Sequence, residues 1–366
     1  MTMQNLALAK TDDLPIRHEG DVHSGKVRSV YWLGYDDSVR IASQKGYDLP
    51  TTELLGVMII SDKISAYECN WKGENGLLGI PGKGAALNAM SEHWFKRIER
   101  TGIGNSHLLE APHPLVWIVQ RAKPVMVEAI ARQYITGSMW RAYAKGERNF
   151  CGITIPDDLE KNQKLDELLV TPTTKGIMKG IPGIPEDDDV NITRQQIMDN
   201  YKAFGFRDQS DVVAYEQMLK DGFKIIYDEL AQKGEIFVDT KFEFGYAWDN
   251  TTGNTELFYI DEIGTADSSR MWNADEYKKG NVVENSKEGF RQFLLNNTNR
   301  EILTDKKRMP ERIELANTYR VPVEQMMEVS ETYKNMAETI TGQKLLEIED
   351  PREEILDELT SYGLVR

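Results

Sequence analysis

Short apolar runs alternate with polar positions through the first third of the chain, a pattern that favours β-strands. We expect these strands at residues 26–33, 38–43, 56–61 and 116–121. One helix interrupts them, because apolar residues recur there at helical spacing. These residues are Leu87, Met90, Trp94 and Ile98. The pattern therefore predicts a β-rich N-terminal third that carries one long helix.

The middle of the chain mixes strands with a loop and a long helix. A second strand-rich block starts near Val125. The Pro- and Gly-rich stretch at residues 171–185 and the acidic residues up to 189 indicate a long surface loop. A helix is predicted at residues 211–233, because apolar residues line one face of it, and Gly234 is placed to end it in a left-handed conformation.

A hairpin and then helices are predicted for the rest. The hairpin strands are residues 236–245 and 256–263, joined by a turn-rich stretch. A helix with an apolar stripe from Met326 to Ile340 ends at Gly342, and Asp350–Pro351 looks like another helix start. The residues beyond Leu345 are expected to form an extra docking helix.

Length and composition indicate a globular protein of more than one domain. A chain of 366 residues exceeds the size at which single cores stop growing. We divide it into residues 1–122, 123–300 and 301–366. Hydrophobic residues make up 40% and charged residues 28%, as in ordinary globular proteins. The two cysteines suggest a reducing compartment, and we recognise neither a signal peptide nor a membrane span.

The chain is acidic, with 44 Lys and Arg against 59 Asp and Glu and a formal net charge of −15. Such a surface repels nucleic acid and anionic membranes, so neither partner is expected. Binding a polyanion such as ATP would require positive charge to be concentrated locally. Lys26 and Arg28 follow Gly25 in a predicted strand and share one face, where they could contact a triphosphate. The alternative is an edge strand protected by charge.

The predicted hairpin offers a candidate metal site. Alternation along the strand places Ile236, Val238, Phe242 and Phe244 on one face and Asp239, Lys241 and Glu243 on the other. A turn centred near residues 251–252 sets Glu243 opposite Asp261, within about a residue of register. Facing carboxylates repel unless a cation lies between them, and Mg²⁺ takes such oxygen ligands. The alternative is a solvated strand face with weak salt bridges.

Two other segments could bind anions. Arg132 is followed by Gly137–Ser138 at a predicted helix start, so a guanidinium and backbone N–H groups could meet an anion there. A plain strand-to-helix turn would explain the same residues. The residues 267–270, Asp-Ser-Ser-Arg, could present hydroxyls and a guanidinium to a sugar phosphate, or form an ordinary turn.

Other chemistries lack their motifs. The five histidines show no metal-ligand spacing, and residues 79–84 lack the pattern of a Walker-type phosphate loop. The chain has no Gly-x-Ser-x-Gly nucleophile elbow, and no Gly-x-Gly-x-x-Gly follows a predicted strand. Serine hydrolase and dinucleotide-binding functions are therefore not favoured.

Taken in order, the segments resemble the SAICAR synthetase (phosphoribosylaminoimidazole-succinocarboxamide synthase) family. The similarity spans roughly residues 20 to 345, and the Asp-x-Lys-aromatic-Glu-Phe-Gly strand and the Arg-x-x-x-Thr-Gly-Ser segment are specific to the family. The matching segments are residues 25–28, 61–67, 124–138, 171–175, 238–245, 261–262 and 267–272. In residues 188–192, Asp188 and Val190 stand where the family often has His and Glu.

The resemblance implies an α+β fold with two lobes, similar to ATP-grasp enzymes and kinases, with antiparallel sheets and a helical C-terminal segment. It implies a cytoplasmic ligase of de novo purine biosynthesis. The enzyme would join the carboxylate of a phosphoribosyl-carboxyaminoimidazole (CAIR) to the amine of L-aspartate to give SAICAR. ATP would become ADP and phosphate through an acyl phosphate, with Mg²⁺ required. A homo-oligomer is also expected from family likeness.

The resemblance also implies roles for individual residues. In residues 1–122, Lys26 and Arg28 would contact ATP phosphates, and Ser61, Asp62 and Ser65 would line the substrate side. In residues 123–300, Glu128 and Lys175 would lie on the adenine side, and Glu243 and Asp261 would hold Mg²⁺. The residues that would bind the substrate are Arg132, Ser138, Asp189, Asp267, Ser269 and Arg270. Apart from the resemblance, we take Asp239 and Lys241 as the candidate catalytic residues, with the hypothesis that Asp239, beside Lys241 and the metal strand, accepts the amine proton or orients substrate.

Two other functions compete with the ligase. A kinase-like phosphotransferase would use the same ATP site but pass phosphate to a hydroxyl, so it would not need aspartate. A nucleotide-sensing binding protein would bind ATP without turnover. An enzyme is favoured because the chain contains both the candidate phosphate contacts and the candidate metal ligands, whereas pure binding does not require a metal beside the transferred phosphate. These residues are Lys26, Arg28, Glu243 and Asp261.

Overall fold

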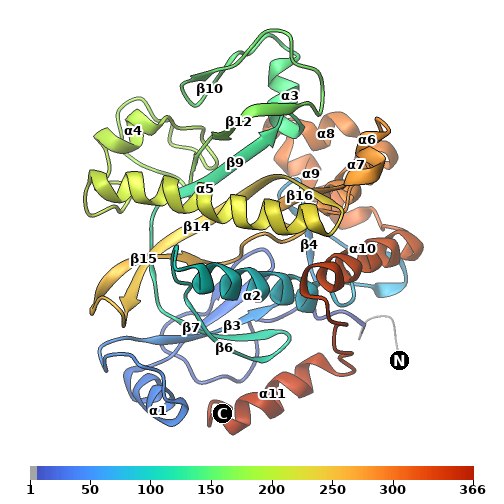
Figure 1. Cartoon of the computed structure of the whole chain (residues 1–366). Helices are drawn as coiled ribbons and strands as arrows, with labels where there is room; N and C mark the ends of the chain where they lie inside the picture. The colour runs from blue at the N-terminus through green and yellow to red at the C-terminus, as the bar shows by residue number, and fades with distance from the viewer. Residues whose placement is uncertain (1–5) are drawn as a thin grey trace. The chain divides into compact units, whose positions relative to one another are not determined.

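The computed structural model describes residues 6–366 and divides into two compact units (Figure 1). The first comprises the chain up to His93, Leu108–Arg121 and Glu284–Arg366. The second comprises Trp94–His107 and Ala122–Val283. The C-terminal helices therefore belong to the same unit as the N-terminal strands. The division expected from the sequence, into a β-rich lobe (residues 1–122), an α+β domain (residues 123–300) and a C-terminal helical segment (residues 301–366), stays a prediction.

A five-stranded antiparallel sheet lies at the centre of the first unit, in the order β1-β2-β3-β7-β6. Its strands are β1 (His23–Ser24), β2 (Arg28–Trp32), β3 (Leu55–Ile60), β6 (Leu108–His113) and β7 (Val116–Gln120). β3 is buried along its whole length between β2 and β7. The small hairpin of β4 (Ile64–Ala66) and β5 (Cys69–Trp71) and the short η2 (Glu74–Gly76) lead to the expected helix, α2 (Lys83–Thr101).

The strand expected at residues 38–43 is wrong, because this segment belongs to helix α1 (Tyr35–Lys45). Asp36 and Asp37 lie in its first turn, where carboxylates favour a helix start. Gly46 ends it in a left-handed conformation with φ of 71°. The buried positions are Ser38 and Ile41, three residues apart, which is helical spacing and not strand alternation.

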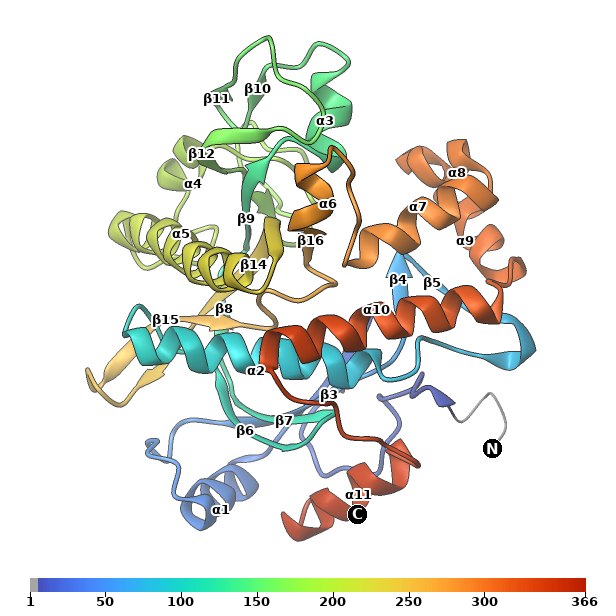
Figure 2. The same ribbon diagram turned by 45° about the vertical axis from the view of Figure 1, so that its right-hand side comes forward.

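The C-terminal helices complete the first unit. They are α7 (Lys287–Asn297), α8 (Arg300–Thr304), α9 (Met309–Thr318), α10 (Val323–Thr341) and α11 (Pro351–Ser361), with the short η3 (Lys306–Arg308). The predicted stripe of α10 is buried, and Gly342 ends the helix with φ of 72°. The expected docking helix is α11, which lies near α1 (Figure 2). Lys45 Nζ donates to Tyr362 Oη at 2.7 Å, and the Arg366 N–H donates to the Pro15 carbonyl at 2.8 Å.

The second unit is built on an antiparallel sheet with the central order β12-β9-β14-β15. β13 adds to β9, whereas β8 and β16 add to β14. The strands are β8 (Lys123–Pro124), β9 (Val127–Tyr134), β12 (Lys164–Val170), β13 (Thr173–Thr174), β14 (Glu235–Asp249), β15 (Asn254–Ile260) and β16 (Ser269–Asn273). Smaller elements are α3 (Gly137–Tyr143), β10 (Asn149–Phe150), β11 (Ile153–Thr154), α4 (Arg194–Asp199) and α6 (Ala274–Lys278).

The long helix α5 (Gln209–Gln232) packs across β14 and β9 (Figure 1). The Asp208 side chain caps its start, and Gly234 follows its end with φ of 77°, as expected. The predicted apolar face is buried from Val212 to Leu230. In the described part of the chain, none of the helices combines the length and the apolar character that crossing a membrane requires.

A register shift in β14 changes which side chains share a face. The ladder between β14 and β16 shifts between Phe237 and Asp239. Ile236 and Val238 therefore pack with Tyr134 and Trp272. Phe237 and Phe244 instead contact aromatic residues of α5, and the ring of Phe242 lies against Gly222 of the same helix. The expectation that Ile236, Val238, Phe242 and Phe244 share one face is thus wrong, because an irregular ladder interrupts strict alternation.

Candidate functional site

Two arginines on neighbouring strands share one carboxylate of β14. The sheet register pairs Asp239 with Arg132 of β9 and with Arg270 of β16. Asp239 Oδ2 accepts from Arg132 Nη1 at 3.1 Å and from Arg270 Nη1 at 2.5 Å. Burial lowers the pKa of Arg132 from its ordinary value; the nearby Asp239 opposes this, and Arg270 adds to it. The three side chains form a largely buried cluster with two positive charges and one negative charge.

Close packing with Arg270 requires a glycine at position 137. Gly137 has φ of 57°, and a Cβ there would lie 2.4 Å from Arg270 Nη2 and 2.7 Å from its Cζ. A side chain would therefore clash with the guanidinium as well as strain the backbone. Thr171 holds the other arginine, because its Oγ1 accepts from Arg132 Nε at 2.9 Å. Both guanidinium groups are thus fixed by their surroundings.

A second ionic network lies further along β14. Lys241 Nζ is 2.6 Å from Glu128 Oε1 and 3.6 Å from Glu243 Oε1. The other Glu243 oxygen, Oε2, accepts from Lys175 Nζ. Thr173 Oγ1 donates to Glu128 Oε2 at 3.1 Å. Burial alone would lower the pKa of Lys241, but Glu243, Glu128 and, more weakly, Asp261 raise it above its ordinary value.

The predicted pairing of Glu243 and Asp261 holds within one residue. Glu243 pairs with Ile260, the residue before Asp261, and the ladder continues to Asp249 paired with Asn254. The turn is therefore centred between Thr251 and Thr252, as expected. Asp261 follows the end of β15 with φ of 60°, and its charge, like that of Glu243, acts on Lys241.

The donor set fits a magnesium ion that arrives with a nucleotide. Among residues 6–366, no group of three or more His, Cys, Asp or Glu could hold a metal by itself. Glu243 and Asp261 provide carboxylate oxygens on neighbouring segments, and Mg²⁺ typically uses one or two carboxylates together with substrate phosphates. The residues present therefore suit an ion that is completed by a phosphate ligand.

Comparisons with known proteins identify the family. Residues 21–307 match the family model described as SAICAR synthetase. The chain belongs to the SAICAR synthetase family. It is 58% identical over 367 aligned residues to phosphoribosylaminoimidazole-succinocarboxamide synthase of Vibrio parahaemolyticus, with 100% of both chains covered. The synthase of Shewanella pealeana is 56% identical over the same span, again with full coverage. The resemblance drawn from the sequence motifs is confirmed.

Solved SAICAR synthetases confirm the fold. The Saccharomyces cerevisiae SAICAR synthase complexed with SAICAR is 26% identical, with a TM-score of 0.65, and 92% of this chain and 99% of that chain are covered. A SAICAR synthetase in complex with ADP matches in fold at 20% identity, with a TM-score of 0.56 and coverage of 90% and 100%. Together with the antiparallel sheets, these matches bear out the expected α+β fold class.

Within the first unit, Asp62 holds other segments together through its side chain. Its Oδ2 accepts from the Leu8 N–H and its Oδ1 from the Gly84 N–H, both at 2.8 Å. Burial raises its pKa from 3.8 to about 6, although these two hydrogen bonds and the positive charges of Lys83 and Lys334 oppose the shift. The expected substrate contact stays a prediction, but both Asp62 oxygens already bind backbone.

The other expected residues of the first unit lie in different environments. Lys26 is exposed in a turn closed by the Gly25 N–H to Arg28 carbonyl bond at 2.7 Å. Arg28 is buried, with its guanidinium 5.8 Å from the Trp117 ring centre. The expectation that Lys26 and Arg28 share one face of a strand is wrong, because the strand starts at Arg28 and Lys26 lies in the turn before it. Ser61 Oγ donates to the Val27 carbonyl, and Ser65 is buried in β4.

The remaining expected residues of the second unit form two groups. Ser269 is buried, and its Oγ lies 2.8 Å from Thr240 Oγ1. These two residues are the sequence neighbours of Arg270 and Asp239. Asp267 is half-buried. Ser138 is exposed at the start of α3. Asp189 is exposed in the 175–193 loop, with φ of 55° and its N–H donating to Asp188 Oδ1 at 3.0 Å. The hydrogen bonds of the arginine cluster described above do not include Asp189.

Sequence reasoning missed the two supporting threonines, and it named Gly137 only as part of an anion-binding helix start, without its packing against Arg270. Thr171, Thr173 and Gly137 fix Arg132, Glu128 and Arg270, respectively. All three lie inside the matched segments. Their position in specific motifs was therefore a usable signal, but a hydroxyl that supports a neighbouring strand cannot be distinguished from a surface threonine by spacing alone.

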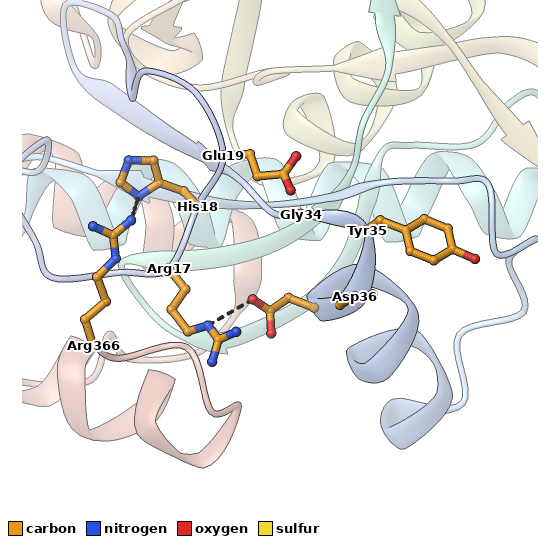
Figure 3. Close-up of a pocket in the computed structure, with 8 residues that line it drawn as sticks. Arg17, His18, Glu19, Gly34, Tyr35, Asp36 and Arg366 are labelled. Carbon is orange, nitrogen blue, oxygen red and sulfur yellow. Dashed lines mark hydrogen bonds and ion pairs between the residues drawn. The ribbon is translucent and has the colours of Figure 1, made fainter.

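A hollow of about 340 Å³ in the first unit is lined by none of the expected site residues (Figure 3). It lies at the start of α1 and is lined by Arg17, His18, Glu19, Gly34, Tyr35, Asp36, Asp37 and Arg366. Arg17 Nε pairs with Asp37 at 3.0 Å. The lining thus contains three carboxylates and two arginines.

Proposed function

We propose that the protein condenses the carboxylate of CAIR with the amine of L-aspartate, while ATP becomes ADP and phosphate, to give SAICAR in purine biosynthesis. Membership of the SAICAR synthetase family confirms the ligase class and this reaction as those of the family. The observation that supports it most directly is the arrangement of β14. One strand carries Asp239 between two arginines and, two and four residues on, Lys241 and Glu243 in a second ionic network.

The reaction needs both clusters for electrostatic reasons. A carboxylate is a poor electrophile, so it is first phosphorylated by ATP to an acyl phosphate with a good leaving group. The aspartate amine then attacks the acyl carbon and phosphate leaves. Three anions must therefore meet, and two like charges about 4 Å apart cost about 4 kcal/mol at an effective dielectric constant near 20. Fixed cations in a partly buried site offset that repulsion.

We assign the arginine cluster to the imidazole nucleotide. Arg132 and Arg270 would bind its phosphate or carboxylate, because guanidinium forks match both groups. Asp239 holds both guanidinium groups through one oxygen, which favours its role in orienting substrate over a role as proton acceptor. Asp267, Ser269, Ser138 and Asp189 are proposed as further substrate contacts from family likeness.

We assign the lysine network to ATP. Lys241 would contact the transferred phosphate. The resemblance implies that Glu128 and Lys175 lie on the adenine side, but because they contact Lys241 and Glu243, we propose that the Lys175 ammonium lies near the phosphates. Lys26 and Arg28 of the first unit are proposed to contact ATP phosphates, and Ser61, Asp62 and Ser65 to lie on the substrate side. Positioning by such residues accounts for much of the rate in phosphoryl transfer.

Glu243 and Asp261 are the proposed magnesium ligands. When bound, Mg²⁺ would neutralise phosphate charge during transfer. Glu243→Gln keeps the size of the side chain but removes its charge, so we expect the Mg²⁺ concentration for half-maximal activity to rise about tenfold or more. Titrating activity with MgCl₂ at saturating ATP measures this. An unchanged magnesium dependence would remove Glu243 from the ligand set.

The decisive assay follows ADP release from the purified protein with ATP, MgCl₂ and the imidazole nucleotide, with and without L-aspartate. We expect full ADP release and SAICAR formation only when all are present. ADP release that does not need aspartate would indicate a phosphotransferase, and ATP binding without turnover would indicate a nucleotide-binding protein. A cytoplasmic location and a homo-oligomeric state are proposed from family likeness.

A further inference from the structure

Both oxygens of Glu243 face an ammonium group. Lys175 Nζ binds Oε2, and Lys241 Nζ lies 3.6 Å from Oε1. Glu243 is 6% exposed, and with Glu128 and Asp261 it places three carboxylates around Lys241. Buried carboxylates that lack a counter-ion are costly, and neighbouring ones repel each other. The two lysines therefore stabilise this acidic group in the protein without ligands.

The two lysines differ in how firmly they are held. Lys241 lies in the middle of β14, where β9 pairs with it, and it also contacts Glu128 at 2.6 Å. Lys175 lies just past the two-residue strand β13, at the start of a stretch without helix or strand that extends to α4. Its backbone N–H is fixed to the Met126 carbonyl at 3.1 Å, so the mobile part is its four-carbon side chain. Lys175 is the lysine that can move away from Glu243 without disturbing the sheet.

We propose that Lys175 is an internal counter-ion that occupies the place of the divalent cation at Glu243 and gives it up when the metal and nucleotide bind. The proposal rests on the magnesium role assigned to Glu243 above. A metal ion coordinates carboxylate oxygens directly, so an ammonium in contact with Oε2 has to leave before that oxygen becomes a ligand. The ammonium released in this way becomes available to the negative charge of the nucleotide. Lys175 thereby suppresses metal binding in the absence of nucleotide.

The test measures metal binding without nucleotide or turnover. Full-length protein is titrated with Mn²⁺, a spectroscopic substitute for Mg²⁺, and free Mn²⁺ is read by electron paramagnetic resonance. We expect Lys175→Met to bind Mn²⁺ about tenfold more tightly than the unmodified protein, which corresponds to about 1.4 kcal/mol. Lys175→Arg keeps the positive charge and is expected to retain the weak affinity. A Lys175→Met protein that binds no more tightly than the unmodified one would overturn the proposal.

Lys179→Met is the matched control. Lys179 is an exposed lysine of the same loop, so its loss makes the same change in net charge. We expect its Mn²⁺ affinity to stay within twofold of the unmodified protein. The tightening in Lys175→Met should persist in about 0.5 M salt, because long-range effects of charge are screened there and direct competition is not. If the tightening vanished with salt, or appeared equally in Lys179→Met, displacement would be refuted.

Two further results separate this proposal from the proposed function. In the double variant Lys175→Met with Glu243→Gln, the Mn²⁺ affinity should not rise, because the carboxylate that the loss of Lys175 would free for the metal is then absent. Circular dichroism and thermal unfolding establish that each variant is folded, and Lys175→Arg provides a folded reference if Lys175→Met is unstable. The ligase assay is run on the unmodified protein. If the unmodified protein forms no SAICAR, the proposed function is wrong. If Lys175→Met does not tighten Mn²⁺ binding, only the counter-ion role of Lys175 is wrong.

Discussion

Asp62 should make the stability of the protein depend on pH in an unusual direction. Burial raises its pKa from 3.8 to about 6 against the opposing effect of its hydrogen bonds from Gly84 and Leu8. The folded state therefore binds the proton more tightly than the unfolded chain does. This contribution to stability is fully present below about pH 4 and is lost as pH rises through about 6. At about 1.4 kcal/mol per pKa unit, the loss is about 3 kcal/mol.

The measurement compares the unmodified protein with Asp62→Asn at each pH. Asparagine does not titrate, and its single side-chain oxygen can replace only one of the two acceptors used by the Leu8 and Gly84 N–H groups, because its NH₂ group is a donor. One buried donor is therefore left unpaired, which costs about 1–3 kcal/mol at every pH. All other titrating groups cancel in the difference. We expect the unfolding free energy of the unmodified protein minus that of Asp62→Asn to fall by about 3 kcal/mol between about pH 4 and about pH 8.

Urea unfolding followed by tryptophan fluorescence provides this difference, because Trp71 and Trp117 are buried in the same unit as Asp62. A difference that stays constant with pH would show that the carboxyl titrates equally in both states. A difference that rises with pH would show that Lys83 and the backbone N–H groups lower the pKa of Asp62 by more than burial raises it. Either result would refute the reasoning.

Two further predictions concern the arginine cluster. Gly137→Ala should raise KM for the imidazole nucleotide about tenfold or more, because its Cβ would displace Arg270; steady-state kinetics measures this. Gly234→Ala, also at positive φ but with open space around it, should cost similar thermal stability and leave KM unchanged. Asp239→Asn should lower kcat/KM about 100-fold through mispositioned arginines while the acid limb of the pH–rate profile stays in place. Loss of that limb would restore Asp239 as the proton acceptor.

Much of the fold follows from local sequence signals. The stop at Gly234, the stripe of α10 with Gly342 and the start of α11 at Asp350 were all predicted, because caps and periodicity act within a few residues. The hairpin register was predicted for the same reason, since the short turn sets the pairing. By contrast, the strand expected at residues 38–43 was wrong, because two acidic residues before it favour a helix start.

The site was predicted less completely than the fold. Residue types and motif order indicated Asp239, Arg132 and Arg270, but the sharing of one carboxylate oxygen depends on two ladders that meet at β14. The register shift near Phe237 also depends on pairing with distant strands, so alternation within one strand could not reveal it. Asp62 is the clearest case. Its partners, Leu8 and Gly84, lie 54 and 22 residues away, and no spacing rule connects them.

The acidic composition explains why the cations of this site come already paired. In a chain of net charge −15, lysines and arginines are attracted to nearby carboxylates. Here Glu128 and Glu243 pair with the lysines, and Asp239 pairs with the arginines. The two clusters then respond differently to an anion. A guanidinium has five N–H donors, so Arg132 can bind a phosphate or carboxylate while keeping Asp239 and Thr171. An ammonium in direct contact with Glu243 has to exchange partners instead. Changes at Asp239 should therefore act on nucleotide affinity, and changes at Lys175 on metal affinity. If one variant altered both in equal measure, the two clusters would have to be treated as a single electrostatic unit.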